Sequence, residues 1–286
     1  MEIKSPAKLN IRLKVTGRRP DGYHELVSIM VPVALFDLIE LESNQTQRIT
    51  ISSQGFSVPE NEDNLVYRAA QSFFSLTGIK QGLSINLTKN IPVAAGLGGG
   101  SSNAANTLKA LNEMWSNPLT FQTLEELAVS LGADVPFFLH GSPCIARGIG
   151  EILEHIEKWP RFWYVIVMPP ISVSTAWVYG NLKLKLTTDE YIFILRYLAK
   201  EMFQIAGILE NDLETVTATR FPVINTIKEA LIRTGAEGAL MSGSGPSVFG
   251  IFKSKDLALS AKRHLASLNL GEVFAVTGLL FGEASN

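Results

Sequence analysis

A glycine-rich segment at residues 92–102, PVAAGLGGGSS, constrains this chain more than any other feature. Alternating apolar residues predict a strand at 83–87 before it, and an apolar stripe predicts a helix through 104–115 after it. Glycines leave backbone amides open to an anion, and a helix N-terminus adds positive potential. Ser101 and Ser102 can cap the helix or donate to phosphate oxygens. The arrangement predicts a loop for the phosphates of a nucleotide triphosphate.

Two common nucleotide-binding motifs do not account for this loop. No Gly-Lys-Ser or Gly-Lys-Thr follows it, which argues against a P-loop. The run from Gly96 to Ser101 lacks the last glycine of the dinucleotide fingerprint. A flexible turn is the simpler alternative. It is disfavoured because glycines at four of the five positions 96–100 carry a high entropic cost, and two serines stand at the helix start.

Length, charge and apolar content limit the classes of protein that fit. The 286 residues suit about two domains, and 46% hydrophobic content with 18% charged residues argues for a folded core. The net charge of −2 favours neither nucleic acid nor acidic membranes, and no apolar run approaches the ~20 residues of a membrane helix. The first ten residues lack a signal-peptide core, and the single Cys144 cannot form an internal disulfide. We expect a cytoplasmic protein with a small-molecule partner and no nucleic-acid or membrane partner; the oligomeric state is left open.

Apolar periodicity predicts an α+β fold in both halves of the chain. In the first half it predicts strands at 3–15, 37–42 and 48–53 and a helix at 64–76. In the second half it predicts strands at 163–168, 248–252 and 274–280, and helices at 189–209, 223–233 and 256–268. The pattern resets near 156–161, so we predict an N-terminal domain at 1–155 and a C-terminal domain at 156–286.

Two charged residues are candidates for phosphoryl transfer. The reaction needs positive charge near the transferred phosphate and is helped by a carboxylate that orients or deprotonates the acceptor hydroxyl. Lys8 begins an otherwise apolar strand, and Asp134 precedes Val135 and Pro136 between two helices. Taken singly, a solvated strand lysine and a helix N-cap are simpler explanations, although Asp134 can be both cap and catalyst.

Five segments together favour catalysis, because the chain resembles the GHMP kinase superfamily, named for galactokinase, homoserine kinase, mevalonate kinase and phosphomevalonate kinase. The segments are SPAKLN at 5–10, RPDGYH at 19–24, the run 92–105, GADVPF at 132–137 and SGSGP at 242–246. The resemblance covers nearly the whole chain. The glycine-rich loop and the last segment specify only the superfamily. The DGYH segment marks one branch, which phosphorylates a hydroxyl of a cytidine-diphosphate-linked sugar alcohol in the non-mevalonate isoprenoid pathway.

The resemblance implies a fold and a set of small molecules. The N-terminal α/β domain is expected to contain a left-handed βαβ crossover, and the C-terminal domain is expected to be ferredoxin-like. ATP and substrate are expected in the cleft between them, with Mg²⁺ bound mainly through ATP. The sequence leaves open whether a protein side chain also holds the metal.

The resemblance also implies roles for particular residues. Asp134 is expected as the general base, and Lys8 is expected to polarise the alcohol or hold the phosphate. The expected phosphate loop is Pro92, Val93, Ala94, Ala95, Gly96, Leu97, Gly98, Gly99, Gly100, Ser101 and Ser102, with Asn64 and Lys89 near the nucleotide. The positions expected to line the cytidine and erythritol sites are Asn10, Tyr23, His24, Thr175 and Tyr179. Asn103 departs from the pattern, because many relatives carry aspartate there, and this affects the electrostatics of the loop.

Without the resemblance, the aromatic residues have two interpretations. Tyr23 and His24 follow a tight turn and can stack on a base and read its edge, or they can simply pack on a sheet edge. Tyr179 can equally be a core residue. The spacing of His140 and His155 does not suggest a metal site, so we expect structural or surface roles for them.

Two other functions compete with this prediction. Another superfamily enzyme, such as a mevalonate-type kinase or the related decarboxylase, would have no reason to keep DGYH at 21–24. A non-catalytic nucleotide-binding regulator would be expected to lose Lys8 or Asp134, and both are present.

Overall fold

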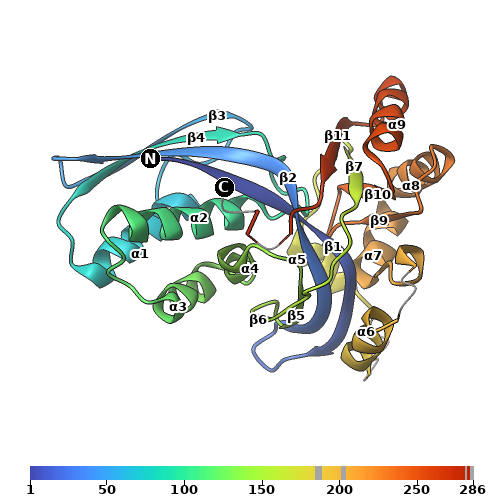
Figure 1. Cartoon of the computed structure of the whole chain (residues 1–286), viewed down its shortest axis with the longest axis horizontal. Coiled ribbons are helices and arrows are strands. Elements are labelled where there is room, and N and C mark those ends of the chain that lie inside the picture. The colour runs from blue at the N-terminus through green and yellow to red at the C-terminus, as the bar shows by residue number, and fades with distance from the viewer. Residues whose placement is uncertain (184–188, 201–203, 281, 284–286) are drawn as a thin grey trace.

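Two β-sheets lie face to face at the centre of the molecule, and helices cover the outer face of each (Figure 1). The computed structural model describes residues 1–183, 189–200, 204–280 and 282–283. Apolar side chains of both sheets share one core between them, and each sheet shares a further core with its own helices. The predicted α+β fold is confirmed.

The first sheet is mixed and is built mainly from the N-terminal half. Among the described residues its strands are β1 (Glu2–Arg18), β2 (His24–Asn44), β3 (Ile49–Gly55), β4 (Gly82–Lys89), β5 (Cys144–Gly148), β6 (Ile152–His155) and β8 (Glu210–Asn211). Their order is β3-β4-β2-β1-β8, with β5 paired to β2 and β6 to β5. Because β8 comes from the second half of the chain, the domain boundary at residue 155 stays a prediction.

The long strand β2 is the element that the sequence pattern underestimates. Only residues 37–42 alternate clearly, whereas the strand begins at His24 and residues 26–33 are all buried. A strand that is buried on both faces reads as a continuous apolar run, so the period of two disappears. The predicted tight turn before Tyr23 and His24 is confirmed, because a turn joins β1 to β2 here.

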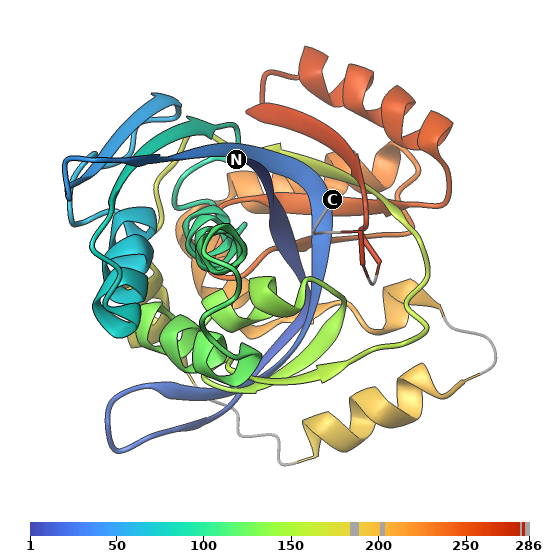
Figure 2. The same cartoon turned by 60° about the vertical axis from the view of Figure 1, so that its left-hand side comes forward.

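Four helices cover the outer face of the first sheet: α1 (Leu65–Thr77), α2 (Gly99–Met114), α3 (Phe121–Leu131) and α4 (Val135–His140). Figure 2 shows α2 nearly end-on, between the sheet and the other helices, and most of its residues are buried. The parallel strands β3 and β4 are joined through α1, so the predicted βαβ unit is present. The left-handed sense of this crossover stays a prediction.

The second sheet is antiparallel and has the order β11-β7-β10-β9. Its strands are β7 (Trp163–Met168), β9 (Gly238–Met241), β10 (Val248–Phe252) and β11 (Glu272–Thr277). Its outer face packs against α7 (Asp212–Arg220), α8 (Val223–Arg233) and α9 (Lys255–Ser267). Numbered along the chain, this order is fourth, first, third and second, which is the ferredoxin-like order that was predicted.

The connection between β7 and β8 differs from its prediction. It contains α5 (Thr175–Asn181), α6 (Glu190–Leu198) and a 3-10 turn, η1 (Ile205–Gly207). A single helix at 189–209 was expected, but α6 ends at Leu198, and residues 201–203 lie outside the described part of the chain. On either side of these residues, the hydroxyl of Tyr197 donates to the carbonyl of Gln204 at 2.6 Å.

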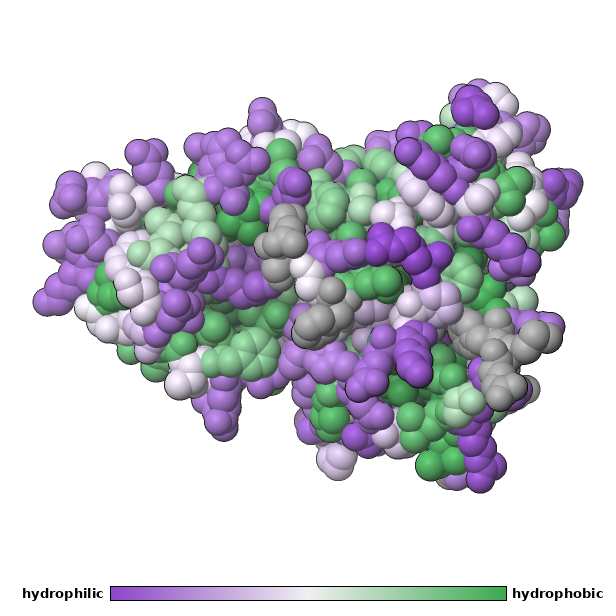
Figure 3. Space-filling view, viewed as in Figure 1, coloured by the Kyte–Doolittle hydropathy of each residue, from purple (hydrophilic) through white to green (hydrophobic). Residues whose placement is uncertain are grey.

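The surface in Figure 3 carries hydrophilic side chains over most of the visible face, with apolar side chains in separate smaller groups. Among the described residues, no helix combines the length and apolar character needed to cross a bilayer.

Alternation along β1 determines which side chains face the candidate site. Ala7 and Leu9 are fully buried in the core between the sheets. Lys8 and Asn10 alternate with them, so they lie on the opposite face of the strand. Two polar residues of an apolar strand are thereby placed next to the glycine-rich loop, where they line the larger cavity described below.

Candidate active site

Two adjoining cavities meet at the glycine-rich loop. The larger, of about 830 Å³, lies between β1, β2, the N-terminal end of α4, and α5. The smaller, of about 310 Å³, lies between residues 58–65, the end of β4 and the outer side of the loop. Ala94, Gly96, Gly98 and Ser101 border both. The loop therefore separates two compartments that suit two reactants.

Most of the predicted site residues line one of these cavities. The larger is lined by Lys8, Asn10, Tyr23, His24, Asp134, Thr175 and Tyr179. The smaller is lined by Asn64, Lys89 and loop residues 92–96 and 98–101. Two members of the predicted loop line neither. Leu97 is buried in the core between the sheets, and Ser102 is fully buried, with its hydroxyl accepting a hydrogen bond from Asn106.

The loop positions backbone amides rather than side chains. Gly98 is the N-cap of α2 with φ of 71°, and the helix begins at Gly99, so the two serines follow the cap instead of forming it. The amides of the first helical turn have no partner within the helix, which leaves them suited to an anion. Of the two roles considered for Ser101 and Ser102, helix capping is therefore wrong, and donation to phosphate oxygens stays a prediction.

A second glycine-rich segment packs against the first. The hydroxyl of Ser242 donates to the carbonyl of Gly96 at 2.9 Å, and the amide of Ser247 donates to the carbonyl of Ala95. A Cβ at Gly96 would lie 2.1 Å from the carbonyl oxygen of Ser242, so only glycine permits this approach. The two segments therefore form one continuous wall of the site.

Lys8 and Asp134 form an ion pair in the wall of the larger cavity. Lys8 Nζ lies 3.5 Å from Asp134 Oδ2, and the lysine is only 4% exposed. The explanation of Lys8 as a solvated strand residue is therefore wrong. Asp134 occupies the N-cap position of α4, but in the described structure its side chain makes no capping hydrogen bond. Its carboxylate is left directed towards Lys8 and the cavity.

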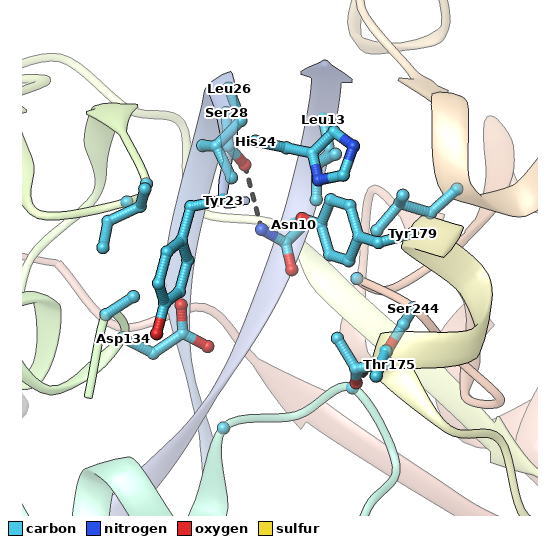
Figure 4. Close-up of a pocket in the computed structure, with 18 of the residues that line it drawn as sticks. Asn10, Leu13, Tyr23, His24, Leu26, Ser28, Asp134, Thr175, Tyr179 and Ser244 are labelled. Carbon is cyan, nitrogen blue, oxygen red and sulfur yellow. Dashed lines mark hydrogen bonds between the residues drawn. The ribbon is translucent and has the colours of Figure 1, made fainter. Parts of the chain in front are cut away.

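Part of the wall of the larger cavity is aromatic. Figure 4 shows Tyr23 and Tyr179 reaching into the pocket from opposite sides, with Asn10 between them in this view. His24 stacks on Tyr179, with ring centroids 5.0 Å apart and an interplanar angle of 28°. Burial, and then the charge of Asp134, raise the pKa of Tyr179, so its phenol stays protonated. Partial burial, and then the charge of Arg18, lower the pKa of His24, so the imidazole is neutral at pH 7.

The side chains of Asn64 and Lys89 bind neighbouring protein groups and so hold the wall of the smaller cavity in place. Asn64 caps α1, accepting from the amide of Val66 and donating to the carbonyl of Pro59. Lys89 forms an ion pair with the buried Asp37 and lies behind the loop. Burial lowers the pKa of Lys89, and the charge of Asp37 opposes that shift.

Asn103 completes this buried group. Its amide oxygen accepts from Lys89 Nζ at 3.0 Å, and its nitrogen donates to Asp37 Oδ2 at 3.0 Å. The other oxygen of Asp37 accepts from the amides of Asn90 and Ile91, which lead into the loop. An aspartate at 103 would place a second carboxylate beside Asp37, whereas the amide can satisfy both charged neighbours. Asparagine at position 103 therefore suits its buried neighbours Asp37 and Lys89 better than aspartate would.

Comparisons with known proteins agree with this geometry. The profile described as GHMP kinases N terminal domain matches residues 64–142, and that described as GHMP kinases C terminal matches residues 194–269. The 4-diphosphocytidyl-2-C-methyl-D-erythritol kinase of Syntrophotalea carbinolica is 48% identical over 95% of this chain and 96% of its own length. The chain belongs to the GHMP kinase family. It is therefore a small-molecule kinase that uses ATP.

Further relatives and solved structures extend this result. The 4-diphosphocytidyl-2-C-methyl-D-erythritol kinase of Geobacter metallireducens is 46% identical over 98% of this chain and 99% of its own length. The crystal structure of a 4-(cytidine 5'-diphospho)-2C-methyl-D-erythritol kinase superposes with a TM-score of 0.83 at 36% identity, covering 97% of this chain and 99% of that one. Homoserine kinase from Cytophaga hutchinsonii has a TM-score of 0.79 at 19% identity over 100% of this chain and 96% of its own, which shows the shared fold.

Several polar residues of this GHMP kinase escaped the sequence analysis. Ser244 lines the larger cavity and its hydroxyl lies 2.8 Å from that of Thr175. Asn211 donates from its amide to the carbonyls of Met241 and Gly243, both at 2.8 Å, and so holds the second glycine-rich segment. The SGSGP motif could have drawn attention to Ser244. No motif surrounds Asn211, whose role depends on a contact 30 residues away in the chain.

The histidines near α4 form a structural cluster. His140 at the end of α4 lies 2.7 Å from Glu125 through Nε2 and 3.1 Å from His155 through Nδ1. The other nitrogen of His155 lies 2.6 Å from the hydroxyl of Ser142. Among the described residues, no group of three or more His, Cys, Asp or Glu side chains could hold a metal ion. The cluster therefore ties α3, α4 and β6 together.

We expect this cluster to make stability depend on pH. Partial burial, and then the charge of His140, lower the pKa of His155 below the ordinary value of about 6.5. The unfolded chain then binds more protons between these two values, so stability should be full above pH 6.5 and fall as the pH falls through the folded pKa. Melting curves from pH 7.5 to 5.5 should show this loss, and His155→Gln should reduce it.

The control for this experiment is His264→Gln, because His264 is an exposed residue on α9, away from the cluster. It should leave the pH dependence as it is in the unmodified protein. If His155→Gln leaves the same pH dependence as the unmodified protein, the cluster does not set it.

Proposed function

We propose that this kinase transfers the γ-phosphoryl group of ATP to the 2-hydroxyl of 4-diphosphocytidyl-2-C-methyl-D-erythritol, in the non-mevalonate route to isoprenoid precursors. Relatives with this kinase name match over nearly their full length, which supports the assignment. The observation that carries it is the pair of cavities joined at the glycine-rich loop, with Lys8 and Asp134 on the acceptor side. We further propose that the kinase acts in the cytoplasm.

Asp134 and Lys8 supply the chemistry in this proposal. Asp134 accepts the proton of the acceptor hydroxyl as that oxygen forms a bond to the γ-phosphorus, and the bond from the γ-phosphorus to the β–γ bridging oxygen breaks to release ADP. Lys8 lies 3.5 Å from the carboxylate, so its charge can stabilise the transferred group. A non-catalytic regulator would have no need to keep this pair in contact.

The smaller cavity would hold the nucleotide. The positive φ of Gly98 and the open amides of the first turn of α2 suit phosphate oxygens, and Asn64 and Lys89 frame the outer side. Mg²⁺ would arrive with ATP, since this ion usually keeps phosphate oxygens and waters as ligands. When bound, it neutralises charge on the β- and γ-phosphates.

The aromatic part of the larger cavity, formed by Tyr23, His24 and Tyr179, would hold the cytosine. Tyr23 is 60% exposed and His24 already covers one side of Tyr179, so we propose that the base enters between Tyr23 and the His24–Tyr179 pair. The neutral His24 can both donate and accept, which suits reading the base edge. Thr175 and Asn10 border the path from the base to Asp134.

The test is the substrate itself. The pure protein with Mg-ATP should release ADP with 4-diphosphocytidyl-2-C-methyl-D-erythritol and not with mevalonate or homoserine. Phosphorylation of mevalonate instead would favour a mevalonate-type kinase. ATP binding without turnover of any of these alcohols would favour the non-catalytic regulator.

Tyr179→Ala should raise KM for the cytidyl substrate by about tenfold or more, because a base–aromatic stack contributes about 1 to 3 kcal/mol and 1.4 kcal/mol is a factor of ten. KM for ATP should change little, since Tyr179 does not line the smaller cavity. Steady-state kinetics with each substrate varied in turn measures both values.

Tyr179→Phe is the matched control, because it keeps the ring and should keep KM for the cytidyl substrate near its original value. A parallel rise of both KM values would mean that Tyr179 packs the structure around the cleft. An unchanged pair of values would place the cytosine elsewhere.

A further inference from the structure

A chain of buried hydrogen bonds runs from Lys8 into the first sheet. Lys8 Nζ donates to Asn10 Oδ1. Asn10 Nδ2 donates to the hydroxyl of Ser28 at 2.9 Å, as the dashed line in Figure 4 shows. Ser28 Oγ in turn donates to the backbone carbonyl of Arg12 at 2.6 Å. Asn10 is 3% exposed and Ser28 is 1% exposed, so bulk water cannot readily replace these bonds.

The carbonyl of Arg12 fixes which group donates and which accepts in each of these hydrogen bonds. A backbone carbonyl can only accept, so the single hydrogen of Ser28 is committed to Arg12. The oxygen of Ser28 must then accept from Asn10, which turns the amide nitrogen of Asn10 towards Ser28 and its oxygen towards Lys8. The reversed amide would place a donor against the ammonium group. Ser28 therefore selects the orientation of Asn10 that Lys8 needs.

An irregularity in the strand pairing brings these groups together. Asn10 lies opposite Met30, but Arg12 lies opposite Ile29, so β1 has one extra residue here, Ile11. β-bulges of this kind redirect backbone and side-chain groups and are frequent beside active sites. Regular pairing resumes at Arg12, and Leu13 lies opposite Ser28.

We propose that Ser28 is a positioning residue for phosphoryl transfer, acting through Asn10 to hold the Lys8 ammonium beside Asp134. Ser28 is a member of the larger cavity wall, but its hydrogen bonds lead to Asn10 and Arg12. The expected kinetic effect rests on the proposed function of Lys8 and Asp134. The hydrogen-bond link between Ser28 and Asn10 can be tested without it.

The kinetic test is Ser28→Ala, alone and combined with Asn10→Ala. Ser28→Ala should lower kcat about tenfold, with KM for both substrates nearly unchanged, because it releases Asn10. The melting temperature should fall somewhat, because the carbonyl of Arg12 loses its buried hydrogen-bond partner. In the Asn10→Ala background, Ser28→Ala should lower kcat little further, since the effects of two residues that act through one another are not additive. Additive losses would overturn the proposal, as would a rise of substrate KM at constant kcat.

Ser5→Ala is a matched control on β1, the strand that carries Lys8 and Asn10 and pairs with the strand of Ser28. Ser5 is fully buried like Ser28, but within the described structure its hydroxyl has no hydrogen-bond partner. Its removal should leave kcat unchanged. A loss equal to that of Ser28→Ala would mean that kcat reports the general packing of β1 and β2, which would contradict the proposal.

Side-chain amide exchange tests the link independently of any substrate. The two side-chain amide protons of Asn10, identified by their absence in Asn10→Ala, should exchange slowly with solvent in the unmodified protein. They should exchange at least tenfold faster in Ser28→Ala and not in Ser5→Ala. Unchanged exchange in Ser28→Ala would refute the link. Accelerated exchange in a protein that does not phosphorylate the cytidyl substrate would refute the proposed function alone.

Discussion

Asp134→Asn should lower kcat by about 10² to 10⁴, the usual range for loss of a general base. The substitution keeps the size of the side chain but removes its capacity to accept the proton. The fold should be spared, because in the described structure the Asp134 side chain makes no capping hydrogen bond and is 37% exposed. Lys8 also keeps its bond to Asn10. ATP binding and the melting temperature should therefore change little.

Asp189→Asn is the matched control for this variant. Asp189 also occupies an N-cap position, at the start of α6, and likewise makes no capping hydrogen bond within the described structure. It lines neither of the two adjoining cavities. Its kcat should equal that of the unmodified protein. Turnover of Asp134→Asn near that of the unmodified protein would remove Asp134 from the mechanism.

Lys8 could be predicted as a site residue from the sequence, whereas Ser28 could not. Lys8 stands out because it interrupts an apolar strand within a motif, so local chemistry and resemblance both select it. Ser28 lies in a strand that is buried on both faces, and its importance comes from a one-residue shift in pairing with β1. Strand register depends on the partner strand as well as on the strand itself, so no local pattern indicates this contact.

The loop was predicted in kind but not in detail. The strand before the loop and the helix after it are where the pattern placed them. The phosphate-binding role of the loop stays a prediction. The position of the cap was not predictable, because it depends on Gly98 adopting a left-handed conformation rather than on a serine side chain. Likewise, the buried pair of Asp37 and Lys89 unites residues 52 positions apart.

Gly98→Val should lower kcat/KM for ATP by about a hundredfold or more, a loss of roughly 2.7 kcal/mol. The backbone at Gly98 has φ of 71°, which a β-branched residue tolerates poorly. A Cβ there would also lie 2.9 Å from Lys8 Cγ and 2.9 Å from Phe138 Cζ. The substitution therefore strains the N-cap of α2 and displaces the lysine that faces Asp134.

The same geometry predicts a loss of stability, because the backbone at Gly98 does not lie on an open surface loop. Gly98 is only partly exposed and touches Phe138 of the helical core, so the melting temperature should fall as well. Gly98→Ala adds the smallest side chain at the same φ and should show the same pattern more weakly. It therefore provides a second variant if the valine protein folds poorly.

Gly100→Ala is the control that shows whether ATP binding is weakened by the loss of any glycine in the loop or specifically by the change at Gly98. Gly100 is exposed in the first turn of α2, and its Cβ would meet Leu65 at 3.6 Å, an ordinary contact. Alanine favours the helix there, so stability should be kept or slightly raised. Calorimetry should then show ATP binding kept in Gly100→Ala and strongly weakened in Gly98→Val. Equal ATP affinity in both variants would mean that the phosphates do not approach the loop at Gly98.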